Sequence, residues 1–118
     1  MPSRQSELEP RLRLPTAIAL GFGPGKAELL RHISKTGSIT RSAALMKMSY
    51  NRAWNLVRDM NRQFREPLVA AARGGRTGGG ALLTSAGKDV ILRYTRMENA
   101  CRKATRDDWK VLRRRLRP

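Results

Sequence analysis

Three side chains within one short stretch have the chemistry needed to read the edge of a DNA base pair. Asn51 and Asn55 carry amides, which can bond adenine through two hydrogen bonds, and the Arg52 guanidinium can bond guanine in the same way. Ser49 is a good helix-capping residue, so all three side chains fall in the first turns of a predicted helix. The N-terminal part of such a helix is the part that enters the major groove. The stretch therefore predicts a base-reading helix.

Hydrophobic spacing indicates which way these side chains point. Apolar residues recur at intervals of four, three and four, which places them on one inward-packing helix face: Ala53, Val57, Met60 and Phe64. The polar and aromatic side chains between them point elsewhere: Tyr50, Asn51, Arg52, Trp54, Asn55 and Arg58. A tyrosine or tryptophan can pack on a sugar or on a thymine methyl group. Trp54 fits the core equally well, because tryptophan is more often packed than exposed. The stretch is also compatible with an ordinary solvated helix face.

A basic, glycine-rich run lies at residues 73–80, between predicted strands at 68–72 and 81–83. The two strands predict a β-hairpin with a long tip. Arg73 and Arg76 could contact phosphate or the minor groove, since glycines let the backbone approach DNA closely. A nucleotide phosphate cradle is an alternative, but the Lys-Ser or Lys-Thr that it requires does not follow here. Another alternative is a disordered loop that becomes ordered on DNA.

Composition narrows the class of protein. The chain has 118 residues and a net charge of +16, of which residues 102–118 carry +6 and residues 1–101 carry +10. That length suits one domain rather than a two-domain enzyme, and the charge favours a polyanionic partner, with anionic membranes and RNA as alternatives to DNA. Cys101 and His32 are single, so we expect no enzyme, no cofactor and no metal site. No apolar run approaches a membrane span and no signal peptide opens the chain, so we expect a cytoplasmic, nucleoid location.

The expected elements are mainly helical with one small hairpin. In chain order they are a short half-buried strand at 11–14, a helix from 24 to 36 closed by Gly37, a short helix capped by Ser38 or Thr40, the helix after Ser49, the hairpin, and a last helix from Thr84. This order is typical of a winged helix-turn-helix with a long C-terminal helix. We divide the chain into a flexible N-terminus (1–10), the winged helix-turn-helix (11–83), a dimerisation helix (84–110) and a basic tail (111–118).

The last predicted helix carries an apolar stripe. Its members are spaced by four, three, four and three residues: Val90, Tyr94, Met97, Cys101 and Ala104. Because a domain this small has one core, a helix of this length must project beyond it. The stripe therefore predicts a homodimer interface. The alternative is that the helix folds back on its own domain.

Several segments carry a specific string of motifs: Gly37-Ser38-Ile39-Thr40, Ala43-Ala44, Ser49-Tyr50-Asn51-Arg52-Ala53-Trp54, Asn61, Pro67-Leu68-Val69, Gly74-Gly75, Gly78-Gly79-Gly80-Ala81 and Leu83-Thr84 with Gly87. This string, over about residues 23–94, resembles the N-terminal DNA-binding domain of the ModE molybdate-responsive regulators. The first half is more distantly similar to the LysR-type helix-turn-helix. The resemblance implies a dimeric repressor or activator. Members of that family carry molybdate- or tungstate-binding domains after this one, at the point where this chain ends, so we expect no molybdate binding.

These observations favour a sequence-specific DNA-binding transcriptional regulator. The alternative is a nonspecific nucleic-acid-binding protein, associated with the nucleoid or with RNA, which would not need amides at a helix N-terminus. The expected partners are double-stranded DNA with an inverted repeat and a second copy of the chain. The candidate DNA-binding residues are Thr40, Arg41, Ser49, Tyr50, Asn51, Arg52, Trp54, Asn55, Arg58, Arg73 and Arg76.

Overall fold

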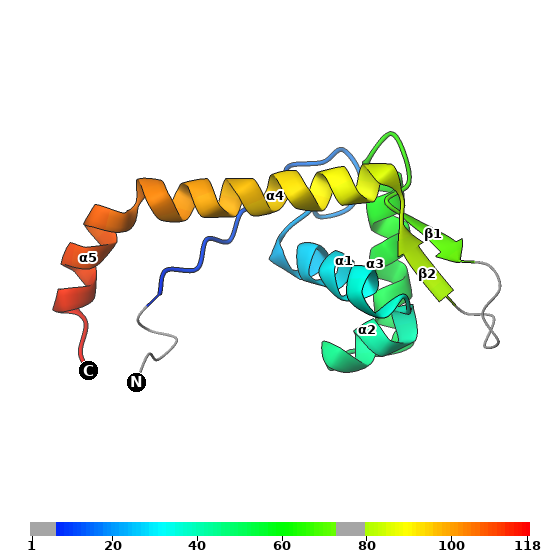
Figure 1. The fold of residues 1–118 in the computed structure, drawn as a ribbon, viewed down its shortest axis with the longest axis horizontal. Coiled ribbons are helices and arrows are strands. Elements are labelled where there is room, and N and C mark those ends of the chain that lie inside the picture. Colours follow the sequence, from blue (N-terminus) through cyan, green and yellow to red (C-terminus); the bar gives the residue numbers. More distant parts are fainter. Residues whose placement is uncertain (1–6, 73–79) are drawn as a thin grey trace.

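The computed structural model describes residues 7–72 and 80–118. Five helices and a two-stranded hairpin follow one another along these residues (Figure 1): α1 (Pro24–Thr36), α2 (Ile39–Leu45), α3 (Tyr50–Gln63), β1 (Val69–Ala72), β2 (Gly80–Leu83), α4 (Ser85–Ala104) and α5 (Arg106–Arg115). The predicted helix-helix-helix-hairpin-helix order is therefore confirmed.

Short-range capping sets the helix starts. Ser38, Ser49 and Thr84 each accept, through the side-chain oxygen, the backbone N–H three residues further on, at 3.0, 3.1 and 3.0 Å. The sequence allowed either Ser38 or Thr40 as the cap of α2, and the structure shows that it is Ser38. Gly37 ends α1 with a φ of 68°, a left-handed conformation that glycine adopts without strain.

The core lies between α1, α3, the hairpin and the first half of α4. The predicted inner faces of α1 and α3 are buried, with Leu30 and Met60 fully covered. Phe22 lies at the centre, where its ring contacts Phe64 and Tyr94 edge-on, with ring centroids 5.6 and 5.4 Å apart. The core therefore joins the loop before α1 to the far end of α3 and the middle of α4.

The hairpin is tied to the turn between α1 and α2. Its antiparallel register pairs Val69 with Leu83 and Ala72 with Gly80. The Ala81 N–H donates to the Gly37 carbonyl at 2.9 Å, so the backbone of this turn continues the pairing beyond β2. The hairpin and the two helices of the turn are thereby held as one unit.

The prediction of a strand at residues 11–14 is wrong. Only an isolated bridge forms, with Leu14 and Phe22 exchanging two backbone hydrogen bonds of 2.7 and 3.0 Å. The expected half-burial is correct, because Leu12 and Leu14 pack on the core while Arg11 and Arg13 are exposed. No ladder extends from the bridge, since the Leu12 carbonyl accepts a hydrogen bond from the Tyr94 hydroxyl at 2.6 Å instead.

The C-terminal helix is interrupted where we expected it to run on to residue 110. α4 ends at Ala104, and α5 begins at Arg106 and extends through most of the segment expected to be a tail. The Thr105 hydroxyl donates to the Cys101 carbonyl at 2.7 Å, a back-bond that bends helices. Asp107 and Asp108 then fall in the first turn of α5, where carboxylates are favoured.

The far part of α4 and all of α5 extend away from the bundle of α1, α2 and α3 (Figure 1), as expected for so long a helix. The whole described structure is correspondingly elongated, at 53 × 32 × 21 Å. None of the helices in the described ranges is both long and apolar enough to cross a membrane.

Candidate nucleic-acid interface

The exposed side of α3 carries the residues predicted to read bases. Asn51, Asn55 and Arg58 are all exposed and lie opposite the buried face of Ala53 and Val57. The Ser49 cap fixes where α3 begins, and the buried face fixes its rotation. Two amides and a guanidinium are therefore presented together on the outward side of the helix.

The two aromatic side chains of α3 are half exposed. Tyr50 has 49% and Trp54 has 45% of its surface accessible to solvent, so the core position that the sequence allowed for Trp54 is not adopted. The Arg58 guanidinium lies over the Trp54 ring, 5.4 Å from its centroid, as a cation–π contact. This contact pre-orients the indole on the surface beside the two amides.

The two flanks of α3 face different neighbours. On one flank, Asn61 bonds the base of the hairpin, and Trp54 lies two turns earlier on the same side. On the other flank, Arg52 and Asp59 face the loop that precedes α1, where they line a shared groove. The outward side of α3 is thus bordered by the hairpin on one side and by this groove on the other.

Asn61 clamps α3 to the hairpin through three hydrogen bonds. Its Oδ1 accepts from the backbone N–H of Leu68 at 2.8 Å and of Val69 at 3.0 Å, and its Nδ2 donates to the Val69 carbonyl at 3.1 Å. The sequence placed Asn61 in the ModE-like string but assigned it no role. The sequence feature that could have indicated this role is an asparagine inside a predicted helix, because asparagine favours side-chain bonds to the backbone over helix formation.

The turn that precedes α3 is built from specific local bonds. Ser42 is fully buried, and its hydroxyl donates to the Ser38 carbonyl at 2.7 Å. Lys47 takes a left-handed conformation with a φ of 55°, which lets the Met48 N–H reach the Ala43 carbonyl at 3.0 Å. These bonds set the angle between α2 and α3.

The other candidate residues lie on α2, at the start of α3 and in the hairpin tip. Thr40 and Arg41 are exposed on the first turn of α2, on the same helix-turn-helix unit as α3. Ser49 is exposed, and its hydroxyl is engaged in capping. Arg73 and Arg76, the predicted contacts of the hairpin tip, lie outside the described residues.

The predicted dimer stripe divides into a covered half and an open half. Tyr94 is only 1% exposed within its own chain, so its assignment to a dimer interface is wrong. The N-terminal segment at 8–14 crosses α4 there and packs Leu12 on the core. The Leu12 carbonyl accepts a hydrogen bond from the Tyr94 hydroxyl. Val90 also packs on that core, whereas Met97 and Ala104 are exposed and Cys101 is half-buried. Folding back therefore accounts for the first half of the stripe only.

An ion pair between the half-buried Arg31 and the buried Glu98 holds α4 against α1. The Arg31 guanidinium donates to the Glu98 carboxylate at 2.7 Å and to the Thr95 hydroxyl at 2.9 Å. Glu98 is 8% exposed, so this pair is far better shielded from water than a surface pair. On α1, His32 is half-buried and its Nε2 lies 3.3 Å from the Glu28 carboxylate.

The groove beside α3 is strongly basic. It encloses about 410 Å³ between the loop before α1 and the flank of α3, and its charged lining consists of Arg11, Arg13, Lys26, Arg52 and Asp59. The Lys26 ammonium is buried and donates to the Gly21 carbonyl at 2.8 Å. Burial lowers the pKa of Lys26, Asp59 opposes this by raising it, and the nearby Arg13 lowers it further.

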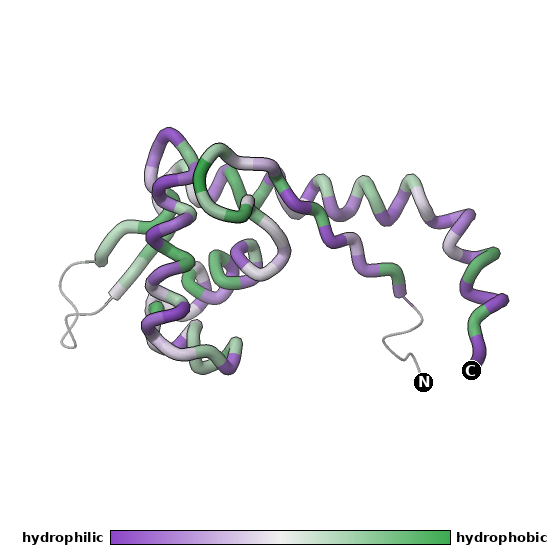
Figure 2. The backbone as a smooth tube through the Cα atoms, turned by 180° about the vertical axis from the view of Figure 1, so that it is seen from behind, coloured by the Kyte–Doolittle hydropathy of each residue, from purple (hydrophilic) through white to green (hydrophobic). Residues whose placement is uncertain are grey.

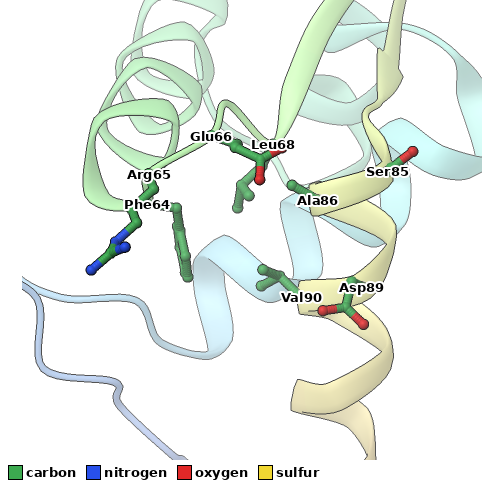
Figure 3. A pocket seen from close by; sticks show the side chains of 8 residues that line it. All are labelled: Phe64, Arg65, Glu66, Leu68, Ser85, Ala86, Asp89 and Val90. Carbon is green, nitrogen blue, oxygen red and sulfur yellow. The ribbon is translucent and has the colours of Figure 1, made fainter.

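A second hollow lies at the other end of α3. It holds about 460 Å³ between the end of α3 and the first turns of α4. Figure 3 shows Phe64 and Val90 on opposite sides of it, while the Arg65 side chain points away. This hollow is remote from Asn51 along α3 and lies outside the base-reading side. Within the described ranges, no three His, Cys, Asp or Glu side chains gather as a metal site would require.

Comparison with known proteins gives a match over most of the region built around α3. Residues 25–88 match the model of the bacterial regulatory helix-turn-helix protein, lysR family. The molybdenum transport protein ModE of Azotobacter vinelandii is 36% identical over 88 residues, which cover 75% of this chain and 33% of that protein. The molybdenum-pterin-binding protein MopA of Rhodobacter capsulatus is 41% identical over 93 residues, covering 79% and 35%.

The DNA-binding transcriptional dual regulator ModE of Escherichia coli K12 is 38% identical over 81 residues, which cover 69% of this chain and 31% of that regulator. The chain thus spans about a third of the length of these relatives. In each comparison most of this chain is matched.

Proposed function

Because the chain belongs to the LysR-type family of bacterial regulatory helix-turn-helix proteins, we propose that it regulates transcription by binding specific DNA sequences through α3. The observation that carries this proposal is the outward side of α3, where Asn51 and Asn55 are exposed in the N-terminal half of the helix and Arg58 is exposed one turn further along the same side. That half is the part of a recognition helix that contacts base edges.

Each side chain of the interface has a distinct role in this proposal. Asn51 and Asn55 bond adenine edges, and Arg58 reaches guanine or phosphate from its position over Trp54. Tyr50 and Trp54 supply apolar contact to a sugar or to a thymine methyl group. Phosphate contacts, which position the protein without reading sequence, come from Thr40, Arg41 and Ser49 and from the predicted hairpin contacts Arg73 and Arg76.

We further propose that the protein binds an inverted repeat as a homodimer. Apolar side chains remain uncovered where α4 and α5 extend beyond the core, and Figure 2 shows hydrophobic and hydrophilic positions alternating along both helices. Exposed apolar side chains of this part are Met97 on α4, Val111 and Leu112 on α5, and Leu116 directly after α5, each 45–56% accessible. Two chains joined there would present two α3 helices to successive major grooves, about 34–36 Å apart.

The alternative is nonspecific binding to nucleic acid, which the net charge of +16 by itself favours. Nonspecific binding needs cations and has no use for paired amides on one side of a helix. The two functions therefore differ in what happens when an amide is removed and the charge is unchanged.

The test is selection of bound duplexes from a random DNA pool, followed by affinity measurements on the selected and a scrambled sequence at one salt concentration. Asn51→Ala or Asn55→Ala should weaken binding to the selected duplex by about 5- to 150-fold, which corresponds to about 1–3 kcal/mol per lost bidentate contact. Binding to the scrambled duplex should stay unchanged. Failure to select a consensus, or equal weakening on both duplexes, would establish the nonspecific alternative.

A further inference from the structure

The basic groove beside α3 holds more positive charge than the folded protein neutralises. Three of its cations, Arg11, Arg13 and Arg52, are exposed at the rim, and none of them forms an ion pair with any described residue. Like charges gathered in one place repel one another, so such an arrangement weakens the free protein. It becomes favourable when an anion occupies the groove.

The single carboxylate of the groove does not cancel this charge. Asp59 interacts with the buried Lys26, whose pKa it raises against the effect of burial. These two opposite charges offset each other beneath the rim. The three arginines at the rim therefore face solvent with their charge intact.

The position of Arg13 is fixed by the surrounding loop. The Arg13 guanidinium packs beside Gly23, and its Nη1 donates to the Leu20 carbonyl at 3.0 Å. Gln63 of α3 holds the same loop, since its Nε2 donates to the Gly21 carbonyl at 2.9 Å. The loop and α3, which line the two sides of the groove, are thus tied together by this hydrogen bond.

We propose that this groove binds the DNA backbone on the side of α3 opposite the hairpin, with Arg11, Arg13 and Arg52 contacting successive phosphates. This inference rests on the proposed function, because it takes α3 to lie in the major groove. Two phosphate backbones border a major groove, and the hairpin occupies one flank of α3 while the basic groove occupies the other. The protein then grips both backbones, and Arg52 acts as a phosphate contact instead of the base contact that its residue type suggested.

The geometry favours a nucleic-acid backbone over a small free anion. α3 itself forms one wall of the groove, with Met48 at its start and Asp59 three turns later. The exposed cations come from both sides of the groove, Arg11 and Arg13 from the segment before α1 and Arg52 from α3. An extended polyanion running past α3 matches that distribution.

The experiment measures how DNA affinity depends on salt concentration, using the selected duplex. Each phosphate contact contributes about 0.9 to the slope of log affinity against log salt. The double variant R11Q/R13Q should therefore lower the slope by about two and weaken binding to selected and scrambled duplexes equally. The matched control is K88Q/R96Q, which removes two exposed cations from α4 and should leave the slope unchanged.

The single variant R11Q guards against a folding defect, because Arg11 forms no hydrogen bond in the described structure whereas Arg13 holds the loop. It should lower the slope by about one without lowering the melting temperature. Ethylation of DNA phosphates should block wild-type binding on both flanks of the recognition site. With R11Q/R13Q, the interference should disappear from the flank away from the hairpin.

Three results would overturn the inference. The first is that R11Q and R11Q/R13Q leave the salt slope unchanged while the wild type still prefers the selected duplex. The proposed function would then stand without this inference. Another is an equal fall with K88Q/R96Q, which would show a general charge effect. The third is that millimolar sulfate, at constant ionic strength, stabilises the wild-type protein but not R11Q/R13Q, while the salt slope of DNA binding is the same for both. That result would show that the groove binds a small anion. If the wild type bound the selected and scrambled duplexes equally well, the proposed function itself would be refuted.

Discussion

Removing the Asn61 side chain should weaken the fold at the junction of the recognition helix and the hairpin. In Asn61→Ala, the backbone N–H groups of Leu68 and Val69 lose their acceptor, and the Val69 carbonyl loses a donor. Leu68 and Val69 are 0% and 6% exposed, so water cannot freely replace the amide. The variant therefore leaves two buried donors without partners.

The expected loss follows from the number of groups left unpaired. Each buried donor without a partner costs about 1–3 kcal/mol. Asn61 itself is only half-buried, so some water will reach the vacated site and the lower part of that range applies. The better helix propensity of alanine returns about 0.5 kcal/mol. The net decrease in the free energy of unfolding should be about 1.5–2.5 kcal/mol, a fall in melting temperature of roughly 6–20 °C for a domain of this size.

Urea unfolding followed by circular dichroism measures this quantity, and α3 provides a matched control. Asn55→Ala makes the same chemical change on the same helix, but Asn55 is exposed and its side chain makes no hydrogen bond in the described structure. It should leave the free energy of unfolding within about 0.5 kcal/mol of the wild type. If the two alanine variants unfolded at the same urea concentration with equal slopes, the clamp would not contribute and the reasoning would be refuted.

Two further predictions concern assembly and ligands. Met97→Glu places a carboxylate on the exposed half of the α4 stripe, where two copies would meet across a two-fold axis, so light scattering should show a dimeric wild type and a monomeric variant. A monomeric wild type at micromolar concentration, or a dimeric variant, would move or remove the interface. Molybdate at millimolar concentration should shift the melting temperature no more than sulfate does, because the groove cations recognise charge rather than one oxyanion. A shift specific to molybdate would reveal a selective site.

The sequence predicted the elements whose determinants lie within a few residues of one another. Ser49 caps α3 through a bond to the third residue on, and the buried faces follow the helical repeat, so both could be recognised locally. The predicted bounds of α1 and the left-handed Gly37 are confirmed for the same reason.

Contacts between distant residues could not be predicted in this way. Tyr94 bonds Leu12, 82 positions earlier, and Arg31 bonds Glu98, 67 positions later, so no local pattern announces either pair. The stripe containing Tyr94 was recognised correctly as apolar, but periodicity does not reveal whether the covering surface belongs to the same chain. The basic groove was missed because it combines a loop, the start of α1 and one flank of α3.

The ion pair between Arg31 and Glu98 has a consequence for operator geometry. α4 has 20 residues and therefore a length of about 30 Å, and the pair anchors it to α1 beyond its midpoint. Without such an anchor, a rotation of about 10° at the first turn of α4 would displace its far end by about 5 Å. The ion pair resists this rotation. Half-site spacing in a dimer joined at that end would then depend in part on the buried Glu98 carboxylate, together with the core contacts of Tyr94. A change at Glu98 would alter which operators fit, although Glu98 lies far from any base.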